Sequence, residues 1–146
     1  MADYTPVTSK GGTYTALTSG IVAGGNLLVV SGSGVVAKAG ADANLAVIGV
    51  AAHDAASGAR VTVWTRGPVH ESLAAGTVTA GDQISTTSTA SRDVESLPVA
   101  AADLGATYVQ AAANTAVNAA INSARGALGV ALTTAGDNVK VRWMAY

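Results

Sequence analysis

Short stretches in which hydrophobic and polar residues alternate recur along the chain. In ARVTVW at 59–64 and in NVKVRW at 138–143, Val residues alternate with polar or basic residues. Because successive side chains of an extended chain point to opposite sides, each stretch predicts a β-strand with one apolar face. Gly-containing segments separate these strands from others, a pattern that is typical of an antiparallel sandwich or a small barrel.

The predicted strands follow the same order in two halves of the chain. LTSGIVAGGNLL at 17–28 aligns without a gap with LAAGTVTAGDQI at 73–84. GVAAHDAASGARVTVW at 49–64 aligns with GVALTTAGDNVKVRW at 129–143 when two residues are dropped from the turn of the first copy. Two such blocks in the same order predict a small antiparallel barrel with an internal pseudo-twofold repeat. Chance similarity among Gly- and Val-rich strands is the alternative.

The alignment predicts a single core between the two halves. It matches Gly58 with Gly136 and Val61 with Val139. The chain has no Phe, two Trp and four Tyr, so Val, Leu and Ile must fill the core. The two Trp follow the Val-rich strands and are interpreted as closing the barrel ends. The Val residues expected in the core are Val50, Val61, Val63, Val130, Val139 and Val141.

The second half contains an insert at about residues 98–126, PVAAADLGATYVQAAANTAVNAAINSARG. Thr107 and Gln110 match a capping box ahead of an Ala-rich run, and the final Arg-Gly pair fits a helix end. We therefore expect one inserted Ala-rich helix, which lies either over one barrel end or against a neighbouring subunit.

The first 16 residues, MADYTPVTSKGGTYTA, stand outside the repeat. They contain Pro6, a Gly pair and polar residues, which favour an extended conformation over a core strand. The sequence thus predicts an extended N-terminal arm at 1–16, followed by a barrel domain at 17–146. Such terminal segments are commonly disordered in isolation, but Tyr4 and Tyr14 offer apolar surface that a partner can bury.

Motifs for catalysis or cofactor binding are absent from the sequence. Without Cys, disulfides and zinc–thiolate sites are excluded, and no G-x-S-x-G nucleophile elbow occurs. His53 and His70 are expected in exposed turns, because no third ligand lies near them in the sequence. Asp93 and Glu95 would share a strand face, but carboxylate pairs of this kind usually lie in solvent. We expect no enzyme activity, no cofactor and no metal.

The charge and the hydropathy of the chain argue against nucleic acid and membrane partners. Eight basic and nine acidic residues leave a net charge of −1, and no basic patch is visible. A run of about eighteen apolar residues is absent, and the start of the chain lacks the apolar region of a signal peptide.

Four segments together resemble the tailed-bacteriophage head decoration proteins, which are also called capsid cement proteins. The similarity extends from about Leu17 to the C-terminus, and the insert departs from the shorter members of the family. The segments are AVIGVA at 46–51, ASGARVTVW at 56–64, RGPVHE at 66–71 and GTVTAGD at 76–82.

This resemblance implies a small β-tulip-like or barrel domain that forms homotrimers. It implies a location on the outer surface of the virion capsid, at three-fold and quasi-three-fold positions, after synthesis in the host cytoplasm. There the trimers would bridge subunits of the major capsid protein and stabilise the head against internal DNA pressure. The family has no catalytic residues, and its N-terminal arm contacts the shell. The arm residues to which this role is assigned are Tyr4, Thr5, Pro6, Val7 and Tyr14.

Alternatives from other classes remain open. One is a different virion protein, such as a head fibre base or a tail component, and its location on capsids or on tails would decide. A carbohydrate-binding module is another; the scarcity of aromatic residues argues against it, and a glycan array would test it. The third is a small trimeric β enzyme, for which the sequence offers no motif.

Overall fold

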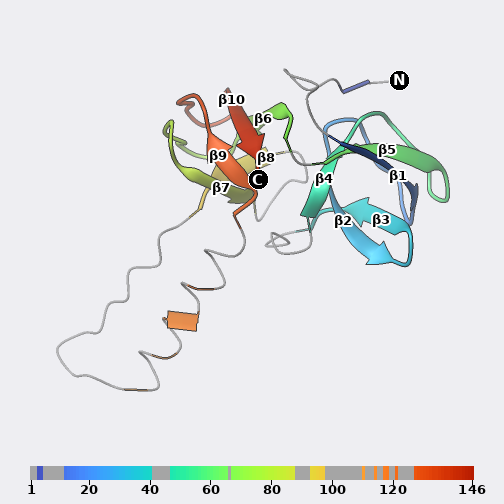
Figure 1. The fold of residues 1–146 in the computed structure, drawn as a ribbon. Coiled ribbons are helices and arrows are strands. Elements are labelled where there is room, and N and C mark those ends of the chain that lie inside the picture. The colour runs from blue at the N-terminus through green and yellow to red at the C-terminus, as the bar shows by residue number, and fades with distance from the viewer. Residues whose placement is uncertain are drawn as a thin grey trace.

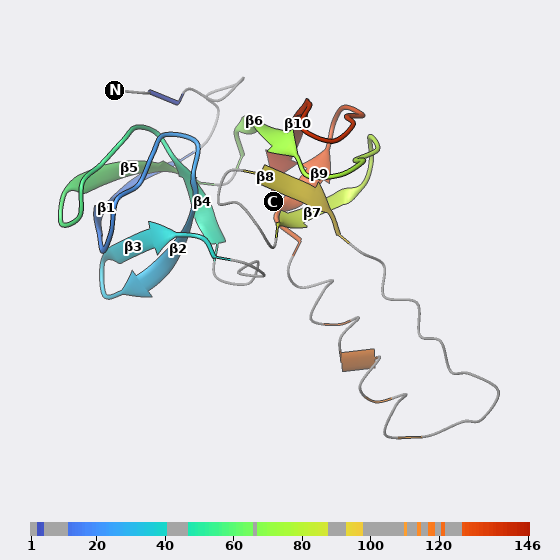
Figure 2. The same cartoon turned by 180° about the vertical axis from the view of Figure 1, so that it is seen from behind.

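A computed structural model shows two small β-barrels side by side (Figure 1), seen from behind in Figure 2. The structure describes residues 3–4, 12–40, 47–65, 67–87, 93–97, 110, 114, 117–118, 121 and 127–146. The first barrel consists of β1 (Thr13–Thr18), β2 (Leu27–Gly32), β3 (Val35–Lys38), β4 (Val47–Ala51) and β5 (Arg60–Trp64). The second consists of β6 (Val69–Ala74), β7 (Gln83–Thr86), β8 (Asp93–Ser96), β9 (Gly129–Ala131) and β10 (Lys140–Ala145). The predicted all-β fold class is confirmed.

The two barrels have the same topology. The first closes in the order β1-β3-β2-β4-β5, and the second closes in the order β6-β8-β7-β9-β10. In each barrel the first and third strands run parallel, and the other neighbouring strands are antiparallel. The internal repeat is therefore present in three dimensions. Each half closes a barrel of its own, whereas the sequence suggested that the halves complete one barrel around a single core.

The pairing of the last strand in each barrel fixes how the two halves align. Ala16 on β1 pairs with Val61 on β5, and Ser72 on β6 pairs with Val141 on β10. Ala16 and Ser72 match at the offset of 56 that the first block already gave (72 − 16). Val61 must then match Val141, an offset of 80 (141 − 61), and this offset needs no gap. The two-residue gap in the sequence alignment is wrong.

The turn that precedes the last strand shows the same match. Gly58 and Asn138 both have positive φ angles, of 77° and 58°. Their N–H groups donate to the equivalent carbonyl oxygens of Thr18 and Ala74, each over 2.8 Å. Gly adopts this conformation freely, and Asn is one of the few other residues that tolerate it. The sequence alignment failed because it matched Gly58 with Gly136 by identity, although the turn requires only tolerance of a positive φ.

The corrected alignment makes Val61 equivalent to Val141, and the observed burial of the Val residues agrees with it. Val61, Val63 and Val141 have no exposed surface, as expected. Val139, by contrast, is 52% exposed, and Val130 is only partly buried. Val139 lies just before β10, beside the turn, and its expected place in the core is wrong.

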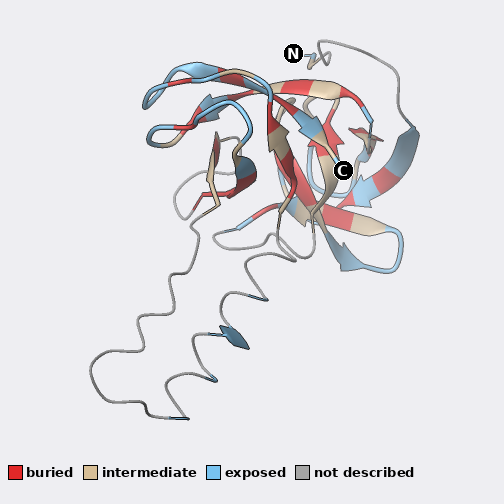
Figure 3. Cartoon of the chain, turned by 60° about the vertical axis from the view of Figure 1, so that its left-hand side comes forward, coloured by how far each residue is buried: buried red, intermediate tan, exposed pale blue. Residues whose placement is uncertain are grey.

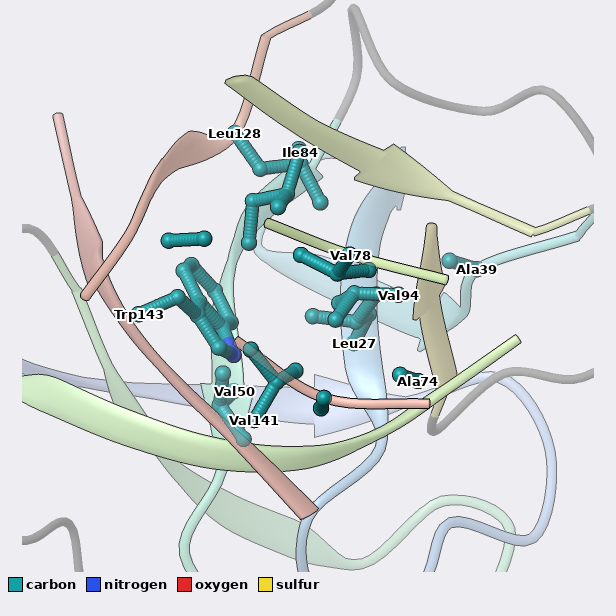
Figure 4. Close-up of a cluster of buried hydrophobic side chains, with 12 residues drawn as sticks. Leu27, Ala39, Val50, Ala74, Val78, Ile84, Val94, Leu128, Val141 and Trp143 are labelled. Carbon is teal, nitrogen blue, oxygen red and sulfur yellow. The ribbon is translucent and has the colours of Figure 1, made fainter. Parts of the chain in front are cut away.

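Two clusters of buried hydrophobic residues take the place of the single expected core. One lies inside the first barrel and contains Leu28 and Ala51. The other fills the second barrel and extends to Leu27 and Val50 of the first (Figure 4). Because neighbours along a strand point to opposite sides, Leu28 faces the interior of its own barrel and Leu27 faces the second barrel. Buried residues lie along the strands of both barrels, and exposed residues lie at the turns and on the outward positions of the strands (Figure 3).

Trp143 fills the second barrel at the position where the first barrel has Val63. Its indole is almost completely buried, and Nε1 donates to Ser72 Oγ over 3.0 Å. A buried indole N–H needs an acceptor, and Ser72 supplies it at the position that Ala16 holds in the first barrel. Trp143 is thus a core residue rather than the cap of a barrel end, while Trp64 points to the other side of β5 from Val63.

The arm and the insert are described only in part. Residues 13–16 belong to β1, so the expected arm at 1–16 reaches too far and must end before residue 13. Five residues of the insert at 98–126 are described, and all have helical backbone: Gln110, Asn114, Val117, Asn118 and Ile121. The other residues of the insert lie outside the described residues. In the part of the chain that the structure describes, no helix is long and apolar enough to cross a membrane.

Candidate functional site

The start of the chain is attached to the first barrel through its backbone. Asp3 forms an antiparallel bridge with His53, and the Tyr4 N–H donates to the carbonyl oxygen of Ala52 over 2.5 Å. Ala52 follows the last residue of β4, at the corner where the chain leaves that strand. The arm thus occupies backbone positions beside the barrel that its own chain forms.

The side chain of Tyr4 reaches across to the second barrel. Its ring stacks on His70 with the centroids 5.7 Å apart, and His70 in turn packs against Trp143 at 4.9 Å. The Tyr4 hydroxyl lies 2.9 Å from His70 Nδ1 and accepts the N–H of Glu71 over 3.1 Å. Tyr4 therefore joins the two barrels, with its main chain on one and its side chain on the other.

These contacts determine the protonation of His70. We assign the Tyr4 hydroxyl as donor to Nδ1, because its oxygen already accepts from Glu71, so the imidazole proton lies on Nε2. Nε2 is buried and has no partner within the described residues. Burial lowers the pKa of His70 to about 4. Burial, with a smaller contribution from the Glu71 carboxylate, raises the pKa of Tyr4 to about 12. Both side chains are neutral at pH 7.

The structure corrects two expectations for this region. His70 was expected in an exposed turn, but it lies on β6 without any exposed surface. The alternation in VHESLA at 69–74 places His70 on the same side of the strand as Ser72 and Ala74, but the Tyr4 ring that stacks on His70 comes from a distant part of the chain. Tyr4 was expected to be buried against a partner, whereas in the structure its ring stacks on His70 of its own chain, and its contact with a shell stays a prediction.

Of the other arm residues to which the resemblance assigned shell contacts, only Tyr14 is among the described residues. Tyr14 lies on β1 opposite Val63 and is 45% exposed. Thr5, Pro6 and Val7 lie outside the described residues. Of the assigned residues in the described part, Tyr14 therefore presents a large apolar surface to solvent, and Tyr4 does not.

His53 has a structural role. Its Nε2 accepts the backbone N–H of Thr62 over 3.2 Å, and Nδ1 lies 3.0 Å from the carbonyl oxygen of Asp54. At the equivalent place in the second barrel, Thr133 Oγ1 accepts the N–H of Arg142 over 2.9 Å. Among the described residues, no group of three or more His, Cys, Asp or Glu is placed to hold a metal ion.

Among the described residues, an ion-pair network lies on β6 and β10, and large apolar residues are exposed on the barrels and at two positions of the insert. Glu71 Oε1 lies 2.8 Å from Lys140 Nζ, and Glu71 Oε2 lies 3.5 Å from Arg142 Nε. These two hydrogen-bonded cations hold the pKa of Glu71 below its usual value. The exposed large apolar residues are Tyr14, Leu17, Ile21, Val30, Leu73, Val117, Ile121, Leu132, Val139, Met144 and Tyr146.

Comparison with known proteins finds similarity at the level of structure. No protein-family model matches the chain, and no curated protein sequence matches it. The crystal structure of the N base of head fibre gp8.5 from bacteriophage phi29 matches with a TM-score of 0.55. The match covers 92% of this chain and 93% of that one, at 16% sequence identity. This chain has the fold of that head fibre base. The similarity includes nearly the whole of both chains and extends beyond a single barrel.

Proposed function

We propose that this protein is a structural protein of a tailed-phage head that binds the outside of the assembled capsid as a decoration, or cement, protein. The observation that carries the proposal is the fold match over nearly the full length with a phage head fibre base. The sequence resemblance to head decoration proteins supports the same location independently. The protein acts by binding, without a catalytic step or a cofactor.

The proposed partner is the major capsid protein, and the proposed binding form is a homotrimer at three-fold and quasi-three-fold positions. Three linked contacts convert a modest affinity at each contact into strong avidity. A ligand that binds the intact shell and not its separate parts stabilises the shell by about 2.7 kcal/mol per site at a hundredfold excess over Kd. Repeated over many sites, this stabilisation would oppose the internal pressure of packaged DNA.

A second candidate is the base of a head fibre. The same structural match favours it, because the matched protein is itself a head fibre base. The two functions differ in their consequence for the capsid. A cement protein must raise the temperature at which heated particles release DNA, whereas a fibre base needs only to remain attached.

The test is to add the purified protein to expanded capsids that carry no decoration. We expect binding to saturate at a fixed copy number per particle, and the heated particles to retain DNA to a higher temperature. Saturable binding without any thermal effect would favour the fibre base over the cement protein. If the protein does not sediment with capsids at all, the proposed location is wrong.

A truncated variant tests the proposed role of the arm. Deleting residues 1–11 leaves all of β1 in place. We expect weaker capsid binding. Because the deletion also removes Tyr4 from His70, the matched control is Tyr4→Ala, which loses the same contact between the barrels and keeps the rest of the arm. Capsid affinity equal to that of the full chain would show that the arm makes no shell contact.

A further inference from the structure

The backbone corner to which the arm binds is present in both barrels. The first corner, at residues 52–53, follows β4, and the second corner, at residues 132–133, follows β9 at the offset of 80. The N–H groups of Ala52 and Leu132 donate to equivalent carbonyl oxygens of β5 and β10, over 2.8 and 2.7 Å. The side chains of His53 and Thr133 accept equivalent N–H groups of the same two strands. The two corners therefore have the same local structure.

The two corners differ in what covers them. On the first barrel, the Tyr4 N–H donates to the carbonyl oxygen of Ala52, and the arm forms a bridge with His53. On the second barrel, no segment among the described residues forms a bridge with Thr133 or donates to the carbonyl oxygen of Leu132. Leu132 is 45% exposed, whereas Ala52 is partly buried. The second corner thus presents the backbone acceptor that the arm uses on the first.

The arms of identical copies cannot fill both kinds of corner. The backbone of Tyr4 is bonded to the first corner of its own chain, and its ring is stacked on His70 of the same chain. Each copy has one arm and two corners, so an exchange of arms between copies would still leave one corner per copy open. This count favours an extended segment of a different protein as the occupant of the second corner.

We propose that the second corner binds an extended segment of the major capsid protein. The segment would add to the exposed backbone through main-chain hydrogen bonds, as the arm adds to the first corner. A donor on the segment would meet the carbonyl oxygen of Leu132, and the Leu132 side chain would pack on the segment. The inference rests on the proposed function, because it assigns to one surface the capsid contact that the function requires.

Two replacements between the corners indicate the chemistry of this segment. Leu132 is larger than its equivalent in the first barrel, so it offers apolar surface to an apolar side chain. Arg142 replaces Thr62 on the strand to which the corner is bonded. Arg142 and Lys140 share the single carboxylate of Glu71, which leaves a local charge of +1 (2 − 1). The complementary segment is extended and carries one apolar and one acidic side chain.

Photo-cross-linking tests which protein occupies the second corner. The variant Leu132→benzoylphenylalanine is bound to expanded capsids that carry no decoration and is then irradiated. We expect a covalent product with the major capsid protein. The matched control is Leu17→benzoylphenylalanine, because Leu17 is 42% exposed and lies on the first barrel.

The outcomes of this experiment separate the proposed site from the proposed function. If the Leu132 variant sediments with capsids but gives no product with the capsid protein, the assigned corner is wrong and the capsid-binding function remains. A product with a second copy of the chain, or an equal yield from the Leu17 variant, likewise overturns the assigned corner. If the natural chain does not sediment with capsids, the proposed function fails as well.

Capsid affinity measured by sedimentation gives a second test. Leu132→Ser removes apolar surface and leaves the backbone of the corner in place, and we expect it to weaken capsid binding by about tenfold. Leu17→Ser is the control and should stay within about twofold of the natural chain. An equal loss for the two variants, or no loss for Leu132→Ser, would show that the second corner makes no specific contact with the shell.

Discussion

His70 is a buried ionisable side chain at the contact between the two barrels. It lies between the rings of Tyr4 and Trp143, accepts a hydrogen bond from Tyr4 and carries no charge at pH 7. A charged imidazole at this position would lose its hydration and could no longer accept the Tyr4 proton at Nδ1. The contact between the arm and the second barrel therefore depends on a neutral His70.

The first prediction, at the residue scale, is a loss of stability in acid. Between pH 6.5 and about 4 the unfolded chain binds a proton at His70 that the folded chain does not. The free energy of unfolding therefore rises with pH across this window, and it falls when the pH is lowered from 7 to 4. The expected loss from His70 is about 3 kcal/mol, measured by urea denaturation at a series of pH values.

The control for this prediction is the variant His70→Gln, which cannot be protonated in this range. Its free energy of unfolding should depend less on pH between 4 and 6.5, whatever its value at pH 7. The Glu71 carboxylate also titrates in acid, and its depressed pKa adds the same loss to both proteins. A pH dependence identical to that of the natural chain would mean that His70 does not hold its buried, neutral state.

At the scale of single elements, the repeated Gly-Val-Ala motif marks a close approach of two strands. A Cβ atom added at Gly49 would collide with the carbonyl oxygen of Trp64 on β5. A Cβ atom added at Gly129 would collide with the carbonyl oxygen of Met144 on β10, the equivalent residue. The motif thus recurs eighty residues apart because both barrels need a residue without a side chain where their fourth and fifth strands meet.

The second prediction tests this requirement. Gly49→Ala and Gly129→Ala should each lower the free energy of unfolding by on the order of 1–3 kcal/mol, because the strands must separate to admit a methyl group. Gly136→Ala is the matched control, since nothing lies within 4 Å of a Cβ atom there and its φ is not positive. The control should stay within about 0.5 kcal/mol of the natural chain. Chemical denaturation measures the free energy of unfolding of all three variants. Equal losses for Gly129→Ala and Gly136→Ala would contradict the close approach of the strands.

At the scale of the whole molecule, one hydrophobic cluster belongs to both barrels. Leu27 and Val50 of the first barrel lie in the same buried cluster as Trp143 and Val141 of the second. Tyr4 adds backbone and side-chain contacts across the same junction. Since neither barrel buries its apolar surface fully without the other, we expect the two to unfold together.

The third prediction compares Leu27 with its equivalent, Gln83. Leu27→Ala should lower the free energy of unfolding by about 2–5 kcal/mol, whereas Gln83→Ala should change it by no more than about 0.5 kcal/mol. Calorimetry should show a single transition for the natural chain, with equal calorimetric and van't Hoff enthalpies. Two transitions, with only one of them sensitive to Leu27→Ala, would mean that the barrels fold independently.

Local patterns in the sequence already determined the class of fold and the presence of a repeat. Alternating Val and polar residues specify strands wherever they occur, because the side-chain period of an extended chain is two. The Gly–Val–Ala motifs and the Gly turns could be located for the same reason, since their requirements are local. The alignment without a gap could also have been predicted from the sequence, because a turn that requires a positive φ accepts Asn138 as well as Gly58.

The tertiary structure alone decided which apolar face is covered and by what. Alternation separates Leu27 from Leu28, but it does not reveal that a second barrel covers Leu27 and that solvent reaches Gln83 at the same place in the repeat. The burial of His70 likewise depends on Tyr4, a residue 66 positions away. Burial of these side chains depends on the packing of distant segments, and the period of a single strand carries no information about that packing.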